Sequence, residues 1–511
     1  MIPNWQRLRR SISEFKETII GFGKTAFTRS GPAFLLPNYQ IICIKETAEL
    51  SAIRQHCSVL SLEKDLPGEP LERSNTSSIL RQSQVQNYLR QLSTFGAIVY
   101  RSSKRTEEAL QNLGGKLLTN PSSIANPFED KLEFRHSAVS AGLPLLPGET
   151  ILLNDLSETT YRQWQKQYGE RLVFQLTDYK VGGGIGTVFV DTRDDLEAFL
   201  SFMQRRREKG KNLQWVNVTP FIEGQAASII GMVTKEGVLA GPLQLQLIDV
   251  PEVTAFYGRN GVFCGHDWRP GRFSSNLQRK AESLARTWGS FIAQRGYKGI
   301  FGLDVVVTSG SCPAFSPKNT HKGTPSWGSP DAGHPSQTQI VFPIECNARY
   351  TGAFPAYAML QLEADEPNFD LFQLAEFLKL DYTFNFEEVQ RQWRESKTGA
   401  QLILHNQTRH WIKINGDLAA GVYEFRNHRL HWLRNGFAMQ DIKNGNTEFV
   451  LTDGVPMRGR IYKPGERLGR ILFKRSIALN HQRLKEQEQE IVKNIYEKYK
   501  IEEIENPEEK N

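Results

Sequence analysis

The chain has 511 residues, of which 39% are apolar and 10% aromatic, and its formal net charge is +7. This length predicts two to four domains, and the composition is that of an ordinary globular protein. The modest positive charge is no nucleic-acid-binding signature, but it is compatible with small anionic substrates.

The sequence favours a cytoplasmic location without stable membrane insertion. No apolar run approaches the length of a membrane span, and the first residues lack the apolar core of a signal peptide. The five cysteines show neither a CxxC pair nor a zinc-binding spacing, which fits a reducing compartment.

Residues 1–38 are expected to form an amphipathic basic helix and a linker. The apolar residues that recur at three- and four-residue steps are Trp5, Leu8, Ile12, Phe15 and Ile19. Their side of the helix can dock onto the protein's own body or onto a membrane surface, and we favour the first. From residue 39 to 122, strand-like runs alternate with helical patterns, which predicts a small α/β domain with a parallel sheet.

Residues 123–380 are expected to form a larger α/β body in two parts. The stretch from Phe128 to Gly142 is predicted to be one helix closed by a glycine C-cap. Residues 309–339 are rich in Ser, Pro and Gly, which predicts a mobile loop between two strands.

Beyond residue 381 the pattern changes. Short strands separated by turn signals predict a separate antiparallel β module over residues 381–475. Residues 476–511 are predicted to be a charged helical tail with a frayed acidic end. The expected fold class is therefore a multidomain α/β (α+β) protein, with an N-terminal α/β domain, a two-part body and a C-terminal antiparallel β module.

The most informative segments are two strand-like stretches, residues 299–307 and 340–352. Side chains alternate between the faces of a strand, so Asp304 in the first, and Glu345 and Asn347 in the second, lie opposite the apolar face. If the strands are neighbours, these three groups meet, with Arg349 at the rim. Mg²⁺ is usually held by one or two carboxylates plus phosphate oxygens, so the pattern indicates a Mg²⁺–polyphosphate site. A surface ion pair is the alternative.

A glycine-rich loop, Lys180–Thr187, lies between two further strand-like runs. It lacks the Gly-Lys-Ser/Thr ending of a P-loop and precedes a strand, so neither that motif nor a dinucleotide fingerprint applies. A glycine-rich hairpin tip still lets backbone N–H groups approach phosphates. A mobile hairpin without a ligand has the same pattern.

The order of these segments resembles the ATP-grasp superfamily, the fold of carboxylate–amine ligases and of biotin carboxylase. The resemblance covers residues 120–360 and, by position, the preceding α/β domain at residues 40–122. It implies that ATP and Mg²⁺ (or Mn²⁺) are the cofactors. The metal ligands of the family carry over onto Asp304, Glu345 and Asn347.

The resemblance also implies catalytic and ATP-binding residues. Lys131 stands where the family has its first ATP-binding lysine, and Arg349 where it has a substrate- or phosphate-contacting arginine, so both are candidate catalytic residues. The candidate ATP-binding residues are Lys131, Gln175, Lys180, Gly182, Gly183, Gly184, Gly186, Thr219, Phe221, Ile222 and Glu223. In this set the glycines belong to the phosphate-covering loop, and residues 219–223 to the adenine-binding hinge.

Two departures from the family pattern leave an alternative open. Gln175 replaces the second phosphate-binding lysine, with Lys180 as a candidate substitute. Gln225 replaces the ribose-binding glutamate after the hinge, so Glu223 or a backbone group takes that role. The loss of one charge-assisted contact costs about 1.5–3 kcal/mol. The alternative to an enzyme is therefore a degenerate, non-catalytic nucleotide-binding protein.

Residues 256–268 gather glycines, aromatic residues and ionisable residues in one segment. In ATP-grasp ligases the comparable region faces the acceptor substrate, so Arg259, His266 and Asp267 are the candidate substrate residues. Cys264 has no base near it in the sequence and is expected to be a buried thiol.

The resemblance implies a ligase that activates a carboxylate as an acyl phosphate with MgATP and couples it to an amine or a similar nucleophile. Its partners are small-molecule carboxylate and amine substrates, with no nucleic acid, and a homo-oligomer is compatible with the sequence. A biotin-dependent carboxylase is a further alternative, although the chain has no Met-Lys-Met biotin-acceptor motif.

Overall fold

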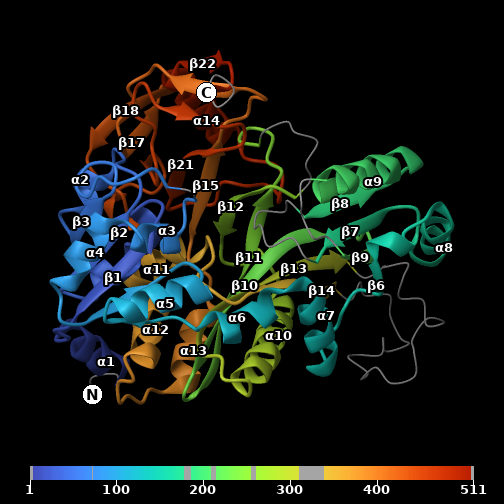
Figure 1. The fold of residues 1–511 in the computed structure, drawn as a ribbon, viewed down its shortest axis with the longest axis horizontal. Helices are drawn as coiled ribbons and strands as arrows, with labels where there is room; N and C mark the ends of the chain where they lie inside the picture. The colour runs from blue at the N-terminus through green and yellow to red at the C-terminus, as the bar shows by residue number, and fades with distance from the viewer. Residues whose placement is uncertain are drawn as a thin grey trace.

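The computed structural model describes residues 4–71, 73–177, 186–208, 214–254, 261–309 and 339–507. Within these ranges, no helix is both long and apolar enough to cross a membrane. Sheets of five, ten, three and four strands organise the described chain, with helices packed against them (Figure 1). This mixture of parallel and antiparallel sheets confirms the multidomain α+β class.

The N-terminal domain contains a five-stranded parallel sheet of order β3-β2-β1-β4-β5. Its strands are β1 (Thr18–Gly23), β2 (Tyr39–Cys43), β3 (Ser58–Ser61), β4 (Phe95–Ile98) and β5 (Gly115–Leu117). The helices of this region are α1 (Asn4–Ser13), α2 (Leu50–Ile53), α3 (Thr76–Leu80), α4 (Ser83–Arg90) and α5 (Lys104–Asn112). The parallel sheet confirms the α/β prediction for this region.

The prediction of a helix through Ile19 and a linker to residue 38 is wrong. Helix α1 ends at Ser13, and Ile19 belongs to β1, the central strand of the sheet. The residues from Ile19 to Phe22 form an apolar run that is buried throughout, as a parallel strand covered on both faces requires. Ile12 belongs to the apolar face of a helix and Ile19 to a buried strand, and the seven-residue spacing between them matches a helical repeat by coincidence.

Helix α1 docks onto the protein's own body, as expected. Trp5, Leu8 and Ile12 are buried in a core that also contains side chains of α12 (Phe369–Phe377). Burial of each such side chain contributes roughly 1.5–3 kcal/mol, which explains why this short helix is held in place.

The helix predicted over residues 128–142 is two helices, α6 (Ser122–Glu129) and α7 (Lys131–Ser140). Asp130 has an extended backbone, and its carboxylate accepts hydrogen bonds from the N–H groups at the start of α7. It is therefore an N-cap. The break places Glu129 and Lys131 at adjoining helix ends, from which both reach residues of the candidate site.

A four-stranded antiparallel sheet of order β6-β9-β7-β8 forms a small lobe (Figure 1, right). Its strands are β6 (Glu149–Leu152), β7 (Leu172–Leu176), β8 (Thr187–Val190) and β9 (Trp215–Pro220). Helices α8 (Glu158–Tyr168) and α9 (Arg193–Glu208) share its buried core. Strands β7 and β8 confirm the strands predicted on either side of the glycine-rich loop.

The ten-stranded antiparallel sheet crosses the body and continues to the C-terminal region. In sheet order its strands are β14 (Gln339–Asn347), β13 (Gly299–Ser309), β10 (Gln225–Thr234), β11 (Gly237–Ile248), β12 (Phe263–Trp268), β15 (Gly399–His405), β21 (Arg467–Phe473), β19 (Glu448–Thr452), β17 (Gly421–Arg426) and β18 (Arg429–Arg434). Helix α10 (Ser275–Ala293) packs on one face, and α12 with α13 (Phe386–Arg394) on the other. Residues 310–338, where a mobile loop is expected, lie outside the described residues.

The C-terminal β module is not separate, contrary to the sequence prediction. Strand β15 pairs with β12 from Gly265↔Leu402 to Trp268↔Gly399, so the body and the module share one sheet. Every residue of β15 is buried, because the strand is covered on both faces and paired at both edges. Such a strand gives no alternating pattern from which its partner could be read.

The predicted C-terminal tail is also corrected. Helix α14 (Glu486–Tyr499) ends at Lys500, which has a left-handed backbone, and β22 (Ile501–Ile504) follows. Strand β22 pairs with β16 (Trp411–Ile414) in a three-stranded sheet that also contains β20 (Ile461–Tyr462). These backbone hydrogen bonds hold the segment that was expected to fray.

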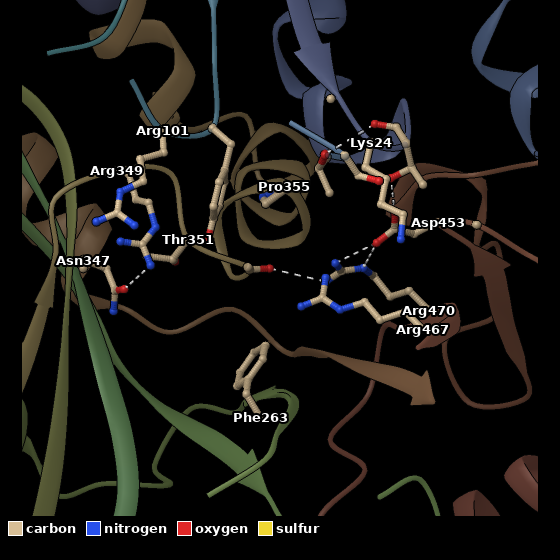
Figure 2. Close-up of a pocket in the computed structure, with 18 of the residues that line it drawn as sticks. Lys24, Arg101, Phe263, Asn347, Arg349, Thr351, Pro355, Asp453, Arg467 and Arg470 are labelled. Carbon is tan, nitrogen blue, oxygen red and sulfur yellow. Dashed lines mark hydrogen bonds and ion pairs between the residues drawn. The ribbon is translucent and has the colours of Figure 1, made fainter. Parts of the chain in front are cut away.

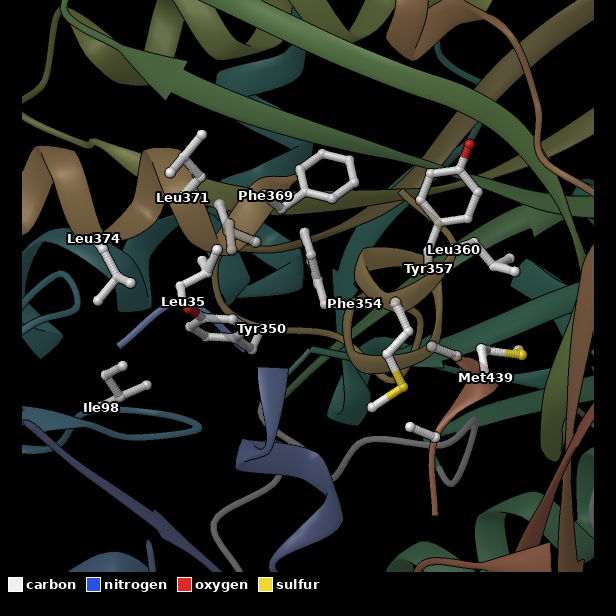
Figure 3. Packing of buried hydrophobic residues seen from close by; sticks show 14 of the residues in the cluster. Leu35, Ile98, Tyr350, Phe354, Tyr357, Leu360, Phe369, Leu371, Leu374 and Met439 are labelled. Carbon is white, nitrogen blue, oxygen red and sulfur yellow. The ribbon is translucent and has the colours of Figure 1, made fainter. Parts of the chain in front are cut away.

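One apolar core joins three parts of the chain (Figure 3). Helix α11 (Phe354–Glu363) and α12 contribute Phe354 and Phe369, whose ring centroids lie 5.2 Å apart. The N-terminal domain contributes Ile98, and the C-terminal region contributes Met439. Because these side chains are buried together, the walls of the space between the three parts are held by common packing.

Candidate active site

The structure brings Asp304, Glu345 and Asn347 together on the neighbouring strands β13 and β14. Asp304 lies directly opposite Glu345 in the register, and Gly302 lies opposite Asn347. The amide of Asn347 donates to Asp304 Oδ2 at 3.0 Å, and Gln246 on β11 donates to Asp304 Oδ1 at 2.7 Å. The three side chains therefore lie together, as strand alternation predicts. Their metal-binding role stays a prediction.

The two carboxyl groups have opposed pKa shifts. Burial raises the pKa of Asp304 to about 8, and the neighbouring carboxylate of Glu345 reinforces this. Burial also acts to raise the pKa of Glu345, but Lys131, Asp304 and Arg349 together outweigh it, and the net shift is downward. The pair therefore holds one proton at neutral pH, and a cation would displace it.

The donor set fits a hard cation better than a transition metal. Within the described residues, no group of three or more His, Cys, Asp and Glu is placed to hold a metal ion. Two carboxylates and an amide oxygen match the few protein ligands that Mg²⁺ takes when phosphates and water complete its shell.

Lys131 is the first residue of α7, and its Nζ lies 3.1 Å from Glu345 Oε2. Its side chain is largely buried, with 14% exposed. In this state the ammonium group neutralises the carboxylate that a metal ion would use. It can contact an incoming phosphate only after that pairing changes.

Arg349 is held by two partners, the polar Asn347 and the acidic Glu129. Its Nη2 donates to Asn347 Oδ1 at 2.7 Å, and its Nη1 pairs with Glu129. Burial opposes the charge of the guanidinium, yet Tyr100 and Glu129 raise the pKa of Arg349 above its ordinary value. Glu129, whose side chain is only 2% exposed, also pairs with Arg101 at 2.5 Å.

These residues line one cavity of about 1000 Å³ between the N-terminal domain, the body and the C-terminal region. Figure 2 shows Arg101, Arg349 and Asn347 on one side of it, and Lys24, Asp453, Arg467 and Arg470 on the other. Phe263 lies between the two sides in this view. The volume is of the size that holds a nucleotide-sized or drug-sized ligand.

The predicted hinge residues lie apart from the described lining of this cavity. Thr219 pairs with Val173 inside the small lobe, and the Phe221 ring lies 3.9 Å from the guanidinium carbon of Arg171. Glu223 is highly exposed and pairs with the same arginine at 3.3 Å. Ile222 follows β9 and does not belong to the described lining either. Their adenine-binding role stays a prediction.

The ATP-binding candidates of the small lobe divide into two groups. Gln175 on β7 and Thr187 on β8 face each other in the sheet and both line the cavity. Gly186 lies just before β8, and its carbonyl accepts a hydrogen bond from Leu176 N–H at 2.8 Å. The others, Lys180, Gly182, Gly183 and Gly184, lie outside the described residues, as does the substrate candidate Arg259.

His266 lines the cavity as an uncharged group. Its Nδ1 lies 2.9 Å from the amide nitrogen of Gln401, and its Nε2 lies 3.4 Å from Ser228 Oγ. Because the Gln401 amide donates, Nδ1 accepts and the proton resides on Nε2. Burial, assisted by the charge of Arg470, lowers the pKa of His266 to about 3, so the ring does not act as a cation near neutral pH.

Asp267 does not face the cavity, and the prediction of a substrate role is wrong in its geometry. Its carboxylate accepts from the backbone N–H groups of Ile477 and Ala478, from the Ser476 hydroxyl, and from Arg272 at 2.8 Å. His266 and Asp267 are consecutive on β12 and therefore point to opposite faces. Asp267 instead ties β12 to the segment before α14.

Two residues that shape the site were missed from the sequence, Gln246 in the cavity lining and Glu129 behind it. Gln246 carries a direct contact to Asp304, and Glu129 holds Arg349 and Arg101. Residues 243–247 read Leu-Gln-Leu-Gln-Leu, so alternation does put Gln244 and Gln246 on one face, but it does not show that this face meets Asp304. For Glu129 the only available signal is its position beside the Asp130 helix cap.

Comparison with known proteins gives matches to solved structures alone. No protein-family model matches the sequence, and no curated protein does. The biotin carboxylase domain of 2-oxoglutarate carboxylase from Hydrogenobacter thermophilus, in complex with MgADP, ADP and bicarbonate, aligns with a TM-score of 0.55 at 11% identity. That alignment covers 89% of this chain and 86% of the other.

Two further structures agree. Biotin carboxylase from Campylobacter jejuni, solved as a complex with β,γ-ATP, aligns with a TM-score of 0.55 at 11% identity, over 90% of this chain and 87% of that chain. Carboxyaminoimidazole ribonucleotide synthase from Aspergillus clavatus, complexed with ATP, aligns with a TM-score of 0.51 at 13% identity, over 94% and 99% of the two chains. At these identities the matches establish the fold.

Proposed function

We propose, on the premise that this chain has the ATP-grasp fold of the biotin-carboxylase-like type, that it is an MgATP-dependent ligase. It would activate a carboxylate as an acyl phosphate and join it to an amine or a similar nucleophile. The observation that carries the proposal is the meeting of Asp304, Glu345 and Asn347, with Lys131 and Arg349, in one cavity.

Mg²⁺ would be held by Asp304, Glu345 and Asn347, and it would supply charge neutralisation for the transferred phosphoryl group. Lys131 and Arg349 are fixed cations that stabilise negative charge developing in the same place. Because water hydrolyses an acyl phosphate, the walls of the cavity and the bound substrates would have to limit its access during the reaction. No covalent bond to the protein is required.

A second candidate function is nucleotide binding without turnover. It is favoured by Gln175, which lines the cavity at the position that resembles a phosphate-binding lysine in the family. An amide offers a weaker contact to phosphate than an ammonium group, so the transition state would be less stabilised. Binding and turnover must therefore be measured separately.

The test is ADP release by purified protein with MgATP and a pool of carboxylates and amines, together with ATP binding by calorimetry. For Asp304→Asn we expect ADP release to fall by about 10²–10³-fold, because one charged ligand of the metal is lost. Asp365→Asn is the matched control, since Asp365 is exposed and pairs only with Arg9 on the surface.

The outcomes separate the two candidate functions. ADP release that depends on both a carboxylate and Asp304 supports the ligase. ATP binding that needs Asp304 but never yields ADP identifies the nucleotide-binding protein. Equal MgATP affinity in Asp304→Asn and wild type would remove the metal assignment.

A further inference from the structure

We propose that the hydroxyl group of Ser228 is a hydrogen-bond donor that binds an oxygen atom of the carboxylate substrate beside Asp304. Ser228 lies on β10 and lines the cavity, although only 4% of the residue is exposed. Its donor character stands on the hydrogen bonds around it. The identity of its ligand as the carboxylate to be activated rests on the proposed ligase function.

Ser228 belongs to a row of side chains that crosses four neighbouring strands. Gln244 on β11 is its cross-strand partner on one side, and Asp304 on β13 is its partner on the other. Asp304 is in turn opposite Glu345 on β14, and all four residues line the cavity. Directly opposed residues of antiparallel strands present their side chains on the same face of a sheet. The Ser228 hydroxyl therefore lies next to the carboxylates for which metal binding is proposed.

The first hydrogen bond at Ser228 has a fixed direction. The indole Nε1–H of Trp268 can only donate, and it donates to Gln244 Oε1 at 2.5 Å. The amide of Gln244 therefore presents its NH₂ group on the other side, where Nε2 lies 2.8 Å from Ser228 Oγ. In this contact Ser228 is the acceptor.

The second contact is directed by Gln401. Its Nε2 lies 2.8 Å from the carbonyl oxygen of Gly352, which can only accept, and its Oε1 accepts from Arg470. The same NH₂ group donates to Nδ1 of His266 at 2.9 Å, which leaves the ring proton on Nε2. This Nε2 faces Ser228 Oγ at 3.4 Å, a long contact in which the imidazole N–H is the donor.

Ser228 Oγ thus accepts from both neighbours, and its own hydrogen has to point elsewhere. Within the described part of the chain, the hydroxyl donates no hydrogen bond to a protein group. The neighbouring Asp304 takes its hydrogen bonds from Gln246 and Asn347 instead. The remaining direction is the cavity, so the group that binds at Ser228 is a hydrogen-bond acceptor.

The neighbourhood of Ser228 indicates which acceptor this is. An atom bound there lies beside Asp304, where the metal-bound phosphoryl group is expected, so it belongs to the group that receives the phosphoryl. In a ligase of the proposed kind that group is a carboxylate, which accepts hydrogen bonds without donating any. The adjacent side chains of Gln244 and His266 are uncharged and do not repel it. A hydroxyl that donates to an ionised oxygen makes a stronger hydrogen bond than one between neutral groups.

The first test determines the direction of the hydrogen bonds without any ligand. Nitrogen NMR of protein labelled in histidine, with the resonance assigned through a His266→Gln variant, reports which ring nitrogen carries the proton. We expect a neutral ring protonated on Nε2 throughout pH 5–8. A proton on Nδ1 would let Ser228 donate to Nε2, and the proposal would be wrong.

The second test uses acetate as the probe for a carboxylate, with a non-hydrolysable MgATP analogue bound. We expect acetate to shift the His266 Nε2 resonance and to bind about tenfold more weakly to Ser228→Ala, which lacks the donor. Ser30→Ala is the matched control. The Ser30 hydroxyl is equally buried but donates to Phe27 O at 2.8 Å, and Ser30 does not line the cavity.

Two results of this titration would overturn the site. One is acetate binding that is absent from wild type or equal in wild type and Ser228→Ala. The other is a tenfold loss of MgATP affinity in Ser228→Ala, measured by calorimetry, because it would assign the hydroxyl to a phosphate of the nucleotide. If the alanine variant does not fold, Ser228→Cys replaces it, since a thiol is only a weak donor.

The role in the reaction is tested by ADP release with a carboxylate that supports turnover. Ser228→Ala should raise KM for that carboxylate about tenfold and leave KM for MgATP within about a factor of two. Ser228→Thr, which keeps the hydroxyl, should restore most of the loss, and failure of this rescue would contradict the donor role. Absence of ADP release with every carboxylate contradicts the ligase function, while the acetate titration still decides whether Ser228 binds a carboxylate.

Discussion

Two walls of the cavity are built in different ways: the carboxylate side, which carries Asp304, Glu345, Asn347 and Lys131, and the arginine side, which carries Lys24, Arg467 and Arg470. On the carboxylate side, Asp304 and Asn347 sit on adjacent strands, and each side chain has a partner in the resting state. On the arginine side, Lys24 and Arg467 come from segments more than 400 residues apart in the sequence, and Arg467 has no hydrogen-bond or ion-pair partner in the described part of the chain. The charged groups of the carboxylate side are paired with one another in the absence of a cation. The guanidinium of Arg467 on the arginine side has no such partner in the described chain and would attract an anion.

Glu129 joins Arg101 of the N-terminal domain to Arg349 of the body, and its removal should have the largest effect on stability. Glu129→Ala leaves Arg101 and Arg349 without their shared carboxylate in a buried position, which should cost roughly 3–5 kcal/mol of the free energy of unfolding. Urea denaturation measures this. Glu158→Ala, which removes an exposed carboxylate with exposed partners, is the control. A change below about 1 kcal/mol, the size of a surface pair, would show that Glu129 does not hold the two arginines together as a buried ion pair.

Glu49 gives the contact between the N-terminal domain and the C-terminal region a pH dependence. This buried carboxyl group accepts a hydrogen bond from Gly454 N–H at 2.7 Å, which links the N-terminal domain to the C-terminal module. Burial raises the pKa of Glu49 from 4.5 to about 7. The folded state therefore holds a proton that the unfolded state has lost between these pH values.

Stability should accordingly fall as the pH rises through this window, by up to about 3 kcal/mol. The measurement is the difference in unfolding free energy between wild type and Glu49→Gln from pH 4.5 to 7.5. Glutamine keeps an acceptor for Gly454 but cannot ionise, so wild type should lose stability relative to the variant. A difference that does not change with pH would show that Glu49 is not the titrating group.

Asp267 is predicted to act on stability alone. Asp267→Asn weakens the hydrogen bonds to Ile477 and Ala478 and the ion pair to Arg272, with an expected cost of about 1–3 kcal/mol. The thermal midpoint should fall, while KM for ADP release stays unchanged once the variant is folded. A KM effect without a stability effect would restore the substrate role that the sequence suggested.

The smallest expected effect is a gain. Gln175→Lys places an ammonium group on the cavity wall at the position that resembles the missing phosphate-binding lysine. ATP should bind about tenfold more tightly, measured by calorimetry with Mg²⁺. Exposed Gln204 on α9 supplies the control Gln204→Lys. Equal or weaker ATP binding by Gln175→Lys would mean that ATP phosphates do not approach β7.

The part of the site that could be predicted from the sequence depends on local geometry. Asp304, Glu345 and Asn347 were found because strand alternation puts them on one face, and a strand pair needs only that rule. The same rule, applied to consecutive residues, shows that His266 and Asp267 cannot face the same space. The error at Asp267 was therefore avoidable.

The rest depends on pairings between distant segments. Nothing in the sequence around Arg467 distinguishes it from Arg458, because exposure to a cavity is set by how β21 joins the sheet. The α/β class and the small lobe were recognised from their patterns, whereas β15 lacks alternation and was assigned to a separate module. Fully buried strands hide both their partners and their register.

The β12–β15 pairing decides where this chain can be divided. A truncated protein that ends after the predicted body, near residue 380, would leave β12 with an unpaired edge in the middle of the former sheet. Such an edge would present unpaired backbone N–H and C=O groups beside side chains that are buried in the whole protein, and it would recruit a strand from another molecule. Attempts to express residues 1–380 by themselves should therefore yield aggregates, and the C-terminal residues protect the body against self-association.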